Sequence, residues 1–244
     1  MMRVALLSDV HANLAALDAV LRRAEADRAE AIWHMGDLVG YGPDPDEVVA
    51  RLVELDARCV LGNHDAAVAG LTGLDTFNDV AADGCRWTID NSTAETRVFL
   101  GALPRSAVDG DFTRVHGSLR DPLWEYLATY EAAEAHFARQ QTRFSVFGHT
   151  HLPALLFENG DGDLEALTPA DGEVAELAEL RCAINPGGIG QPRDGDPRAC
   201  YALLDTATLE VTFRRVPYDV PTTQRRIIER GLPRFLAMRL AAGR

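Results

Sequence analysis

Short apolar runs alternate with longer amphipathic segments in the first part of the chain. The apolar runs cover residues 3–7, 31–35 and 58–61, and the segments between them place their apolar residues three or four positions apart. This pattern predicts the order strand, helix, strand, helix, strand. Strands joined through helices form a parallel sheet with right-handed crossovers, and ligands of such sheets collect at the carboxyl ends of the strands.

The rest of the pattern predicts a second sheet and two helical regions. Helical spacing predicts a cap over residues 66–103 and one or two basic amphipathic helices over 222–240. After Pro153, short apolar pieces separated by glycine-containing turns predict antiparallel hairpins. A predominantly antiparallel second sheet packed on the first gives an α/β two-sheet sandwich flanked by helices. We therefore expect one domain over residues 1–244.

Carboxylate, amide and imidazole side chains directly follow five of the apolar runs. The candidate metal ligands among them are Asp9, His11, Asp37, Asn63, His116, His149 and His151. Residues two apart in an extended segment face the same side, so His149 and His151 can both face one point. Oxygen and nitrogen ligands without sulfur suit manganese, iron, nickel, cobalt or zinc, and the absence of thiolate disfavours a structural zinc. Seven ligands are too many for one ion that leaves room for substrate, so two ions roughly 3.5 to 4 Å apart, sharing a carboxylate, fit better.

Composition and charge narrow the class of protein. The chain has 244 residues, 47% of them hydrophobic, which is typical of a globular protein with a sizeable core. Its formal net charge of −13 argues against general binding to nucleic acid or an anionic membrane, so any bound phosphate should meet metal. Four widely spaced cysteines predict buried thiols in a reducing compartment. We find no signal-peptide pattern or membrane-length apolar run and expect a cytoplasmic protein.

The motifs together resemble those of a known superfamily. Asp9-Val10-His11, Gly36-Asp37, Gly62-Asn63-His64-Asp65, His116 and Gly148-His149-Thr150-His151 are similar, in order, to the five motifs of the calcineurin-like metallophosphoesterases. The resemblance implies a four-layer αββα sandwich. It also implies one metal on Asp9, His11, Asp37 and His151 and another on Asp37, Asn63, His116 and His149. Asp37 would then bridge the ions, while His64 would stay off the metals as the catalytic residue facing the leaving group.

The implied activity is metal-dependent phosphoester hydrolysis. The chain looks most like the small prokaryotic phosphoesterases, which would hydrolyse phosphodiesters or phosphomonoesters of small molecules or nucleotides by metal-hydroxide attack on phosphorus, with Mn²⁺ first among the candidate metals. We expect a preference for diesters, because glycines at 187–190 leave room beside the metals but supply few cations. The partner should be a small phosphoester, with no stable nucleic-acid or membrane binding, and a homo-oligomer is left open.

Two alternatives of different classes remain. The first is a non-catalytic, protein-binding scaffold of the same fold, although decayed sites normally lose ligands and all seven are present here. The second is a protein serine/threonine phosphatase. It is weakened by the acidic chain and by the stretch 40–43, which lacks the arginine that those enzymes carry.

One departure from the superfamily pattern concerns the catalytic histidine. Many members carry an aspartate that orients this histidine at the position of Gly40, so His64 lacks that carboxylate. The two remaining histidines have structural interpretations. His34 should be a buried sheet residue, and His136 should be exposed on a polar helix.

Two candidate substrate-binding residues each have two interpretations. Asn13 resembles a phosphate contact of the superfamily, but it also stands where a helix N-cap is expected. Arg193 could reach a phosphate from the glycine-rich loop, or it could pair with Asp194 or Asp196.

Overall fold

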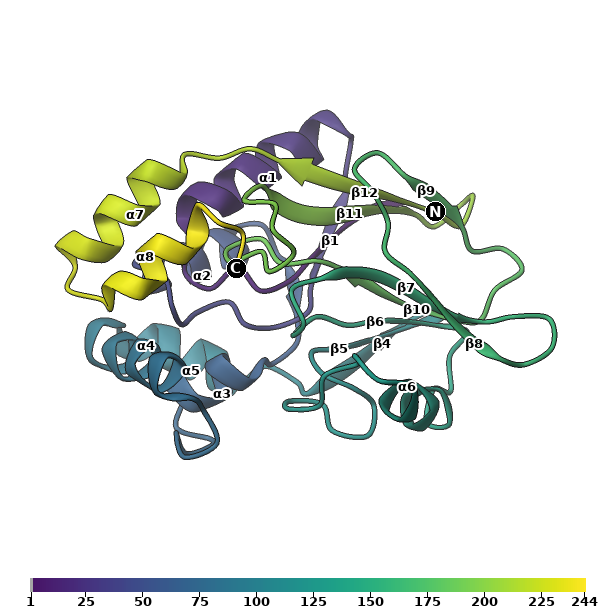
Figure 1. The fold of residues 1–244 in the computed structure, drawn as a ribbon, viewed down its shortest axis with the longest axis horizontal. Coiled ribbons are helices and arrows are strands. Elements are labelled where there is room, and N and C mark those ends of the chain that lie inside the picture. Colours follow the sequence, from purple (N-terminus) through teal and green to yellow (C-terminus); the bar gives the residue numbers. More distant parts are fainter. Residues whose placement is uncertain (1) are drawn as a thin grey trace.

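Two six-stranded sheets lie face to face between layers of helices in the computed structural model, which describes residues 2–244 (Figure 1). The outer helices are α1 (Leu14–Ala26) and α2 (Pro45–Glu54) on one side and α6 (Tyr130–Phe137) on the other. The fold class is therefore α/β with two mixed sheets flanked by helices, as the sequence predicts.

The first sheet has the strand order β3-β2-β1-β11-β12-β9. Its strands are β1 (Arg3–Leu7), β2 (Ala31–His34), β3 (Arg58–Cys59), β9 (Val174–Glu176), β11 (Ala199–Asp205) and β12 (Glu210–Val216). Strands β1, β2 and β3 are parallel, and β11 pairs with β1 antiparallel. The parallel part agrees with the predicted strand and helix alternation, and it brings the carboxyl ends of three strands to one edge.

The second sheet has the strand order β4-β5-β6-β10-β7-β8. Its strands are β4 (Ser106–Asp109), β5 (Phe112–Val115), β6 (Phe144–Val146), β7 (Pro153–Glu158), β8 (Leu164–Leu167) and β10 (Cys182–Pro186). Strand β10 is parallel to β6 and antiparallel to β7. All five of its residues are buried, as a central strand covered on both faces requires.

The expected arrangement of the segments after Pro153 is only partly right. Strands β7 and β8 form a hairpin, and so do β11 and β12. However, β9 pairs with β12 in the first sheet, β10 inserts between β6 and β7, and β5, β6 and β10 are parallel. Three of the five strand pairings in the second sheet are antiparallel and two are parallel, so the sheet is mixed. Local patterning specifies strands and tight turns, whereas these strands pair with partners remote in sequence.

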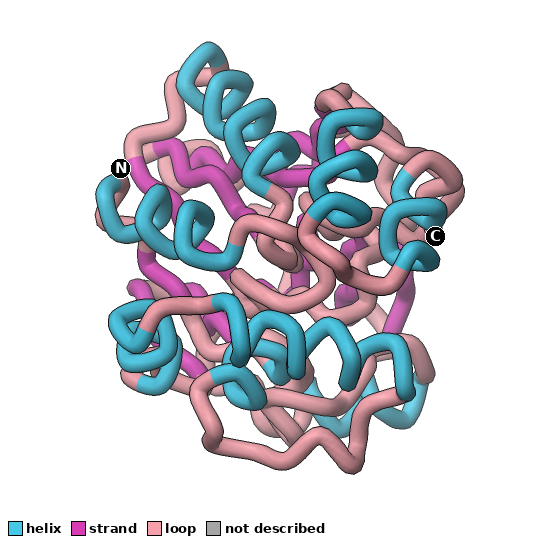
Figure 2. The backbone as a smooth tube through the Cα atoms, turned by 90° about the vertical axis from the view of Figure 1, so that its left-hand side faces the viewer, coloured by secondary structure: helices cyan, strands magenta, loops and turns pink. Residues whose placement is uncertain are grey.

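Helices cover the end of the sandwich where the parallel strands finish (Figure 2), and five of them come from the segments predicted to be the cap and the tail. They are α3 (Asn63–Val68), α4 (Asp79–Asn91), α5 (Ala94–Gly101), α7 (Val220–Glu229) and α8 (Arg234–Leu240). The first three account for the predicted cap and the last two for the predicted tail helices. We propose a single domain, since strands from both halves of the chain alternate within each sheet.

His34 lies where the sequence predicts, but His136 does not. His34 is buried in β2, and its Nδ1 accepts the Gly36 N–H at 3.1 Å. His136 was expected to be exposed, but it is fully buried on α6 and contacts Ser145 Oγ at 2.8 Å and the Leu119 N–H at 3.1 Å. The helix is polar only on its outer face, and a lone imidazole in the pattern does not reveal which face it occupies. Among residues 2–244, no helix combines the length and apolar character needed to cross a membrane.

Candidate metal centre

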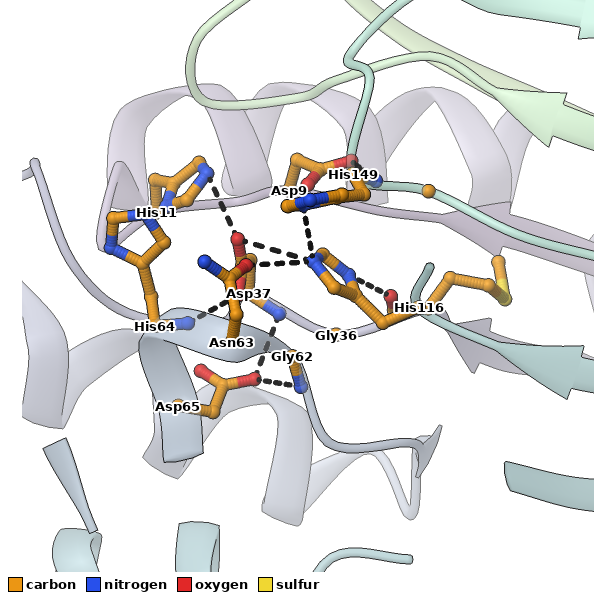
Figure 3. Close-up of polar contacts among 12 residues, drawn as sticks. Asp9, His11, Gly36, Asp37, Gly62, Asn63, His64, Asp65, His116 and His149 are labelled. Atoms are coloured by element: carbon orange, nitrogen blue, oxygen red, sulfur yellow. Dashed lines mark hydrogen bonds and ion pairs between the residues drawn. The ribbon is translucent and has the colours of Figure 1, made fainter. Parts of the chain in front are cut away.

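The seven candidate ligands lie together at the helix-covered edge of the sandwich, between the ends of the two sheets (Figure 3 shows six of them). Asp9 and His11 follow β1, Asp37 follows β2 and Asn63 begins α3. His116 follows β5, and His149 and His151 follow β6. All are buried, so the site is a desolvated cluster contributed by both sheets.

The first pair of imidazoles is oriented by backbone carbonyl groups. His11 Nδ1 lies 3.0 Å from the Val39 carbonyl oxygen, and His151 Nδ1 lies 2.6 Å from that of Gln191. A carbonyl only accepts, so each Nδ1 carries the proton and each Nε2 keeps a lone pair. The two Nε2 atoms are 3.1 Å apart. Two lone pairs at this distance repel unless a cation lies between them.

A second pair repeats this arrangement. His116 Nδ1 donates to the Met35 carbonyl at 2.7 Å, and His149 Nε2 donates to the Trp124 carbonyl at 3.2 Å. The facing atoms, His116 Nε2 and His149 Nδ1, are 3.0 Å apart, and Asn63 Oδ1 lies 3.1 Å from the same His116 nitrogen. Burial lowers the pKa of His149 to about 3, so its imidazole is in the neutral form that binds metal. For His116 the Asp37 carboxylate outweighs burial and raises the pKa to about 9, so without a cation its Nε2–H can donate to His149 Nδ1, and a bound cation would take the place of that proton.

One carboxylate oxygen lies between the two pairs. Asp37 Oδ2 is 3.6 Å from His11 Nε2 and 3.4 Å from His116 Nε2. Asp9 Oδ1 is 3.4 Å from His151 Nε2 and, within the described chain, has no hydrogen-bond donor although it is fully buried. An orphaned buried carboxylate oxygen and converging imidazole lone pairs fit divalent cations of intermediate hardness.

The backbone that carries these ligands is strained. Asp9, His11, Asp37, His149 and His151 all have φ between +47° and +65°, a region that non-glycine residues seldom adopt. Such residues cost on the order of 1 kcal/mol or more each and persist where the surroundings fix them. Here His11 N donates to the Asp37 carbonyl at 3.0 Å, and Asp9 N donates to that of Gly36 at 3.1 Å. The ligand loops therefore hold each other in place.

Asp65 is a supporting residue to which the sequence pattern assigned no role. Its carboxylate is fully buried and accepts four backbone N–H groups. Oδ2 accepts from Asp37 at 2.8 Å and Gly62 at 3.1 Å, and Oδ1 accepts from Leu38 at 2.9 Å and Val39 at 3.1 Å. The carboxylate thus joins the Asp37 loop to the start of α3 (Figure 3). The available signal was its position three residues after the helix N-cap, where acidic side chains commonly cap.

Two other features of the site have no counterpart in the sequence reasoning. Tyr126, 48% exposed, stacks on His149 with ring centroids 3.9 Å apart. Cys85, on α4, reaches the ring of His64. Both come from segments whose spacing predicts only helix or loop, so the sequence carries no signal for either contact.

His64 lies beside the cluster, on the first turn of α3. Its backbone N–H donates to Asp37 Oδ1 at 2.9 Å, and the residue is 3% exposed. Its ring also lies close enough to His11 and Asp37 for the three to form a third possible cation-binding group. Burial lowers the pKa of His64 to about 4.

The glycine-rich loops do not leave the expected room beside the ligands. A Cβ on Gly188 would lie 2.9 Å from that of His151, and one on Gly190 would lie 1.8 Å from the Val10 carbonyl oxygen. These glycines allow the loop after β10 to pack directly on the ligand loops. The space argument for a diester preference is therefore wrong.

Asn13 is the N-cap of α1. Its Oδ1 accepts the Ala16 N–H at 3.2 Å and the Thr223 hydroxyl at 3.1 Å, and its Nδ2 donates to the Gly190 carbonyl at 3.0 Å. These contacts use the side chain for capping and for tethering α7 and the glycine-rich loop. The structure thus supports the capping interpretation of this residue.

Arg193 is not paired with the carboxylates beside it in sequence. Asp194 pairs with Arg215, and Asp196 pairs with Arg198. Arg193 donates to Gln191 Oε1 at 3.2 Å, while its buried Nε has no partner among residues 2–244. Burial, and next the positive charge of Arg193, hold the pKa of His151 well below its usual range. The guanidinium is therefore close to the cluster and free of acidic partners in the described chain.

Known proteins with similar sequences or structures cover nearly the whole chain. A model of the calcineurin-like phosphoesterase superfamily domain matches residues 2–209. The crystal structure of a metallophosphoesterase from Sphaerobacter thermophilus is 45% identical, with a TM-score of 0.90 over 100% of this chain and 99% of that one. The uncharacterized protein MJ0912 of Methanocaldococcus jannaschii is 34% identical over 99% of this chain and 98% of its own length. Phosphodiesterase YfcE of Escherichia coli is 27% identical over 86% of this chain and 91% of its own.

Proposed function

Because the chain belongs to the calcineurin-like phosphoesterase superfamily and is a metal-dependent phosphoric ester hydrolase, we propose that it uses two divalent ions to hydrolyse small phosphoesters. One ion would be held by Asp9, His11, Asp37 and His151. The other would be held by Asp37, Asn63, His116 and His149. Mn²⁺ is our first candidate, and iron, zinc, nickel or cobalt would suit the same ligands.

The observation that carries the two-ion proposal is the repeated imidazole pairing. The pairs His11/His151 and His116/His149 have facing nitrogens 3.1 and 3.0 Å apart, and backbone carbonyls occupy the other ring nitrogens, so each imidazole in its neutral form turns a lone pair towards its partner. Asp37 Oδ2 lies between the pairs. A single cation could bind between the nitrogens of only one imidazole pair, whereas two cations would serve both imidazole pairs. The intact ligand set also disfavours a non-catalytic scaffold.

The residues of the chain then have distinct roles. Divalent ions bound at these positions would lower the pKa of water and polarise phosphoryl oxygens. His64, beside the cluster, would donate a hydrogen bond to the leaving-group oxygen of the ester. Arg193 would bind a phosphoryl oxygen through the donors that the protein leaves free. Burial of the ligands keeps bulk water away from most of the cluster.

We propose nucleotides or other small-molecule phosphoesters as substrates, without stable binding to nucleic acid. The acidic chain and the buried position of the cluster support a small ligand. We also propose the cytoplasm as the compartment, because all four cysteines are free and buried.

The deciding experiment is metal analysis combined with an activity screen. Protein purified without chelator should carry two ions per chain. The manganese-loaded form should hydrolyse members of a panel of phosphomonoesters, phosphodiesters and nucleotides, and EDTA should remove the activity. One ion per chain at full activity would contradict the binuclear site, and no hydrolysis of any ester would contradict the proposed substrate class.

Replacing His64 tests its proposed role towards the substrate. His64→Ala should retain two ions and the fold, while kcat on an ester with a poor leaving group falls by roughly 10²-fold, the range of a lost proton donor. The loss should be smaller on bis(para-nitrophenyl) phosphate, whose leaving group needs less assistance. Loss of an ion from this variant would instead show that His64 is a metal ligand, a role that its closeness to His11 and Asp37 allows.

Replacing Arg193 tests the preference between esters. A dianionic monoester gains more from an added cation than a monoanionic diester. Arg193→Ala should therefore lower kcat/KM for para-nitrophenyl phosphate about tenfold more than for bis(para-nitrophenyl) phosphate, as expected for a lost charge-assisted hydrogen bond. Arg198→Ala is the matched control, since Arg198 lies in the same loop but pairs with Asp171 and Asp196. An unchanged ratio in Arg193→Ala would mean that the cationic contact lies elsewhere.

A further inference from the structure

The ring of His64 has one polar contact with the rest of the chain. Its Nδ1 lies 3.2 Å from Cys85 Sγ, and its Nε2 has no hydrogen-bond partner within residues 2–244. Aromatic rings also pack around it, with centroids 4.4 Å away at Tyr41, 4.8 Å at His11 and 4.9 Å at Phe77. Aromatic packing restricts the position of the ring, and the polar group at Nδ1 favours one of the two tautomers of the neutral imidazole.

Gly40 explains why this contact is made by a residue from another part of the chain. A Cβ at Gly40 would lie 2.4 Å from His64 Nδ1, and the residue has φ +88°. Any other L-residue here would be strained and would collide with the imidazole. The carboxylate that many superfamily members place at this position is thus excluded by backbone conformation and by space. The imidazole instead packs on the bare backbone of Gly40 and turns its Nδ1 towards α4.

Helix α4 is docked so that its thiol reaches this nitrogen. Asn78 caps the helix by accepting the Ala81 N–H at 3.0 Å. One turn later, Gly84 packs on the backbone of Tyr41, where an added Cβ would lie 3.2 Å from the Tyr41 nitrogen. The next residue, Cys85, is fully buried. Burial raises the pKa of its thiol, so the group stays neutral and can donate its S–H to an imidazole nitrogen.

We propose that Cys85 is the positioning residue for His64, taking the place of the absent carboxylate at Gly40. Its S–H donates to Nδ1, so the proton of the neutral imidazole resides on Nε2. The nitrogen without a protein partner thereby becomes the donor available to a leaving-group oxygen. A thiol forms weaker hydrogen bonds than a carboxylate and carries no charge. This chain would therefore orient His64 without adding a negative charge beside the metal ligands. This inference rests on the role proposed for His64.

The test compares three cysteine variants in two backgrounds. Cys85→Ala removes the contact, Cys85→Ser keeps a small donor, and Cys182→Ala makes a matched deletion of a buried thiol far from His64. On a diester with a poor leaving group, Cys85→Ala should lower kcat about tenfold at unchanged metal content, and Cys85→Ser should recover most of that loss. In a His64→Ala background, Cys85→Ala should have no further effect. Cys182→Ala should leave kcat unchanged relative to the parent protein in both backgrounds.

A spectroscopic measurement gives an answer that does not depend on turnover. In zinc-loaded, ¹⁵N-labelled protein, long-range ¹H–¹⁵N spectra should show His64 with its proton on Nε2, and Cys85→Ala should shift the Nδ1 resonance while Cys182→Ala does not. An unmoved Nδ1 resonance in Cys85→Ala would overturn the inference. So would an equal loss of kcat from Cys85→Ala in both His64 backgrounds, because a purely structural defect behaves in that way.

The same experiments separate the inference from the proposed function. If wild-type protein hydrolyses the diester and His64→Ala is impaired while Cys85→Ala is not, only the role of Cys85 is wrong. If metal-loaded wild-type protein hydrolyses no ester, the proposed function is wrong, and the spectra of His64 still decide whether Cys85 holds its ring.

Discussion

Asp37→Asn is expected to empty both metal positions and to lower kcat/KM by about 10³-fold or more. The Asp37 carboxylate lies between the two imidazole pairs, with Oδ2 3.6 Å from His11 Nε2 and 3.4 Å from His116 Nε2. An amide of the same size offers one weaker neutral oxygen, and its NH₂ group would repel a cation. Loss of both ions would remove the nucleophile and most of the stabilisation of charge in the transition state.

Metal analysis and kinetics on the same preparation check this expectation. Asp18→Asn is a suitable control, because it makes the same chemical change at a partly exposed residue. Asp18 pairs with Arg51 on the outer surface. Circular dichroism should show both variants folded. Two ions per chain retained by Asp37→Asn at full occupancy would contradict the bridging role, even if activity were lost.

Asp65→Asn is expected to cost about 3 kcal/mol or more of the free energy of unfolding, in metal-free protein. The carboxylate accepts four backbone N–H groups in a fully buried position. An asparagine keeps one oxygen, so its NH₂ must face two N–H donors whichever way the amide is turned. Each buried polar group left without a partner costs roughly 1 to 3 kcal/mol. The Asp37 loop should then lose its defined position, and metal affinity with it.

Urea denaturation in EDTA isolates the effect on folding from the effect of metal. Asp205→Asn provides the matched control, because Asp205 also accepts backbone N–H groups, from Ala207 and Thr208, but in an exposed turn. Asp205→Asn should change the midpoint of urea denaturation little. A wild-type midpoint for Asp65→Asn would show that the four hydrogen bonds contribute no net stability.

The position of the candidate ligands could be anticipated because it follows from local rules. Polar residues directly after apolar runs lie at strand ends, and parallel strands bring those ends to one edge. The positions of Asp9, Asp37 and His116 could be predicted without knowing which strands remote in sequence pair with each other. The pattern was also sufficient for α1, α2 and the two hairpins, whose turns are encoded by adjacent residues.

The rest depends on contacts between segments remote in sequence. Nothing in residues 174–176 indicates that β9 joins the first sheet, because a three-residue apolar piece fits either sheet equally well. The sequence predicts only a buried thiol at Cys85, and its contact with His64 follows from how Gly84 of α4 packs on Tyr41 and how His64 packs on Gly40. His136 was misplaced for the same reason, since its burial depends on Ser145 and Leu119.

The left-handed backbone at Asp9, His11, Asp37, His149 and His151 implies a conflict between durability and chemistry. Glycine would adopt these conformations without strain, so replacing such a ligand with glycine should relax the backbone while deleting a metal contact. The strain at these five positions is thus the cost of placing side chains there, and binding of cations by those side chains would offset it.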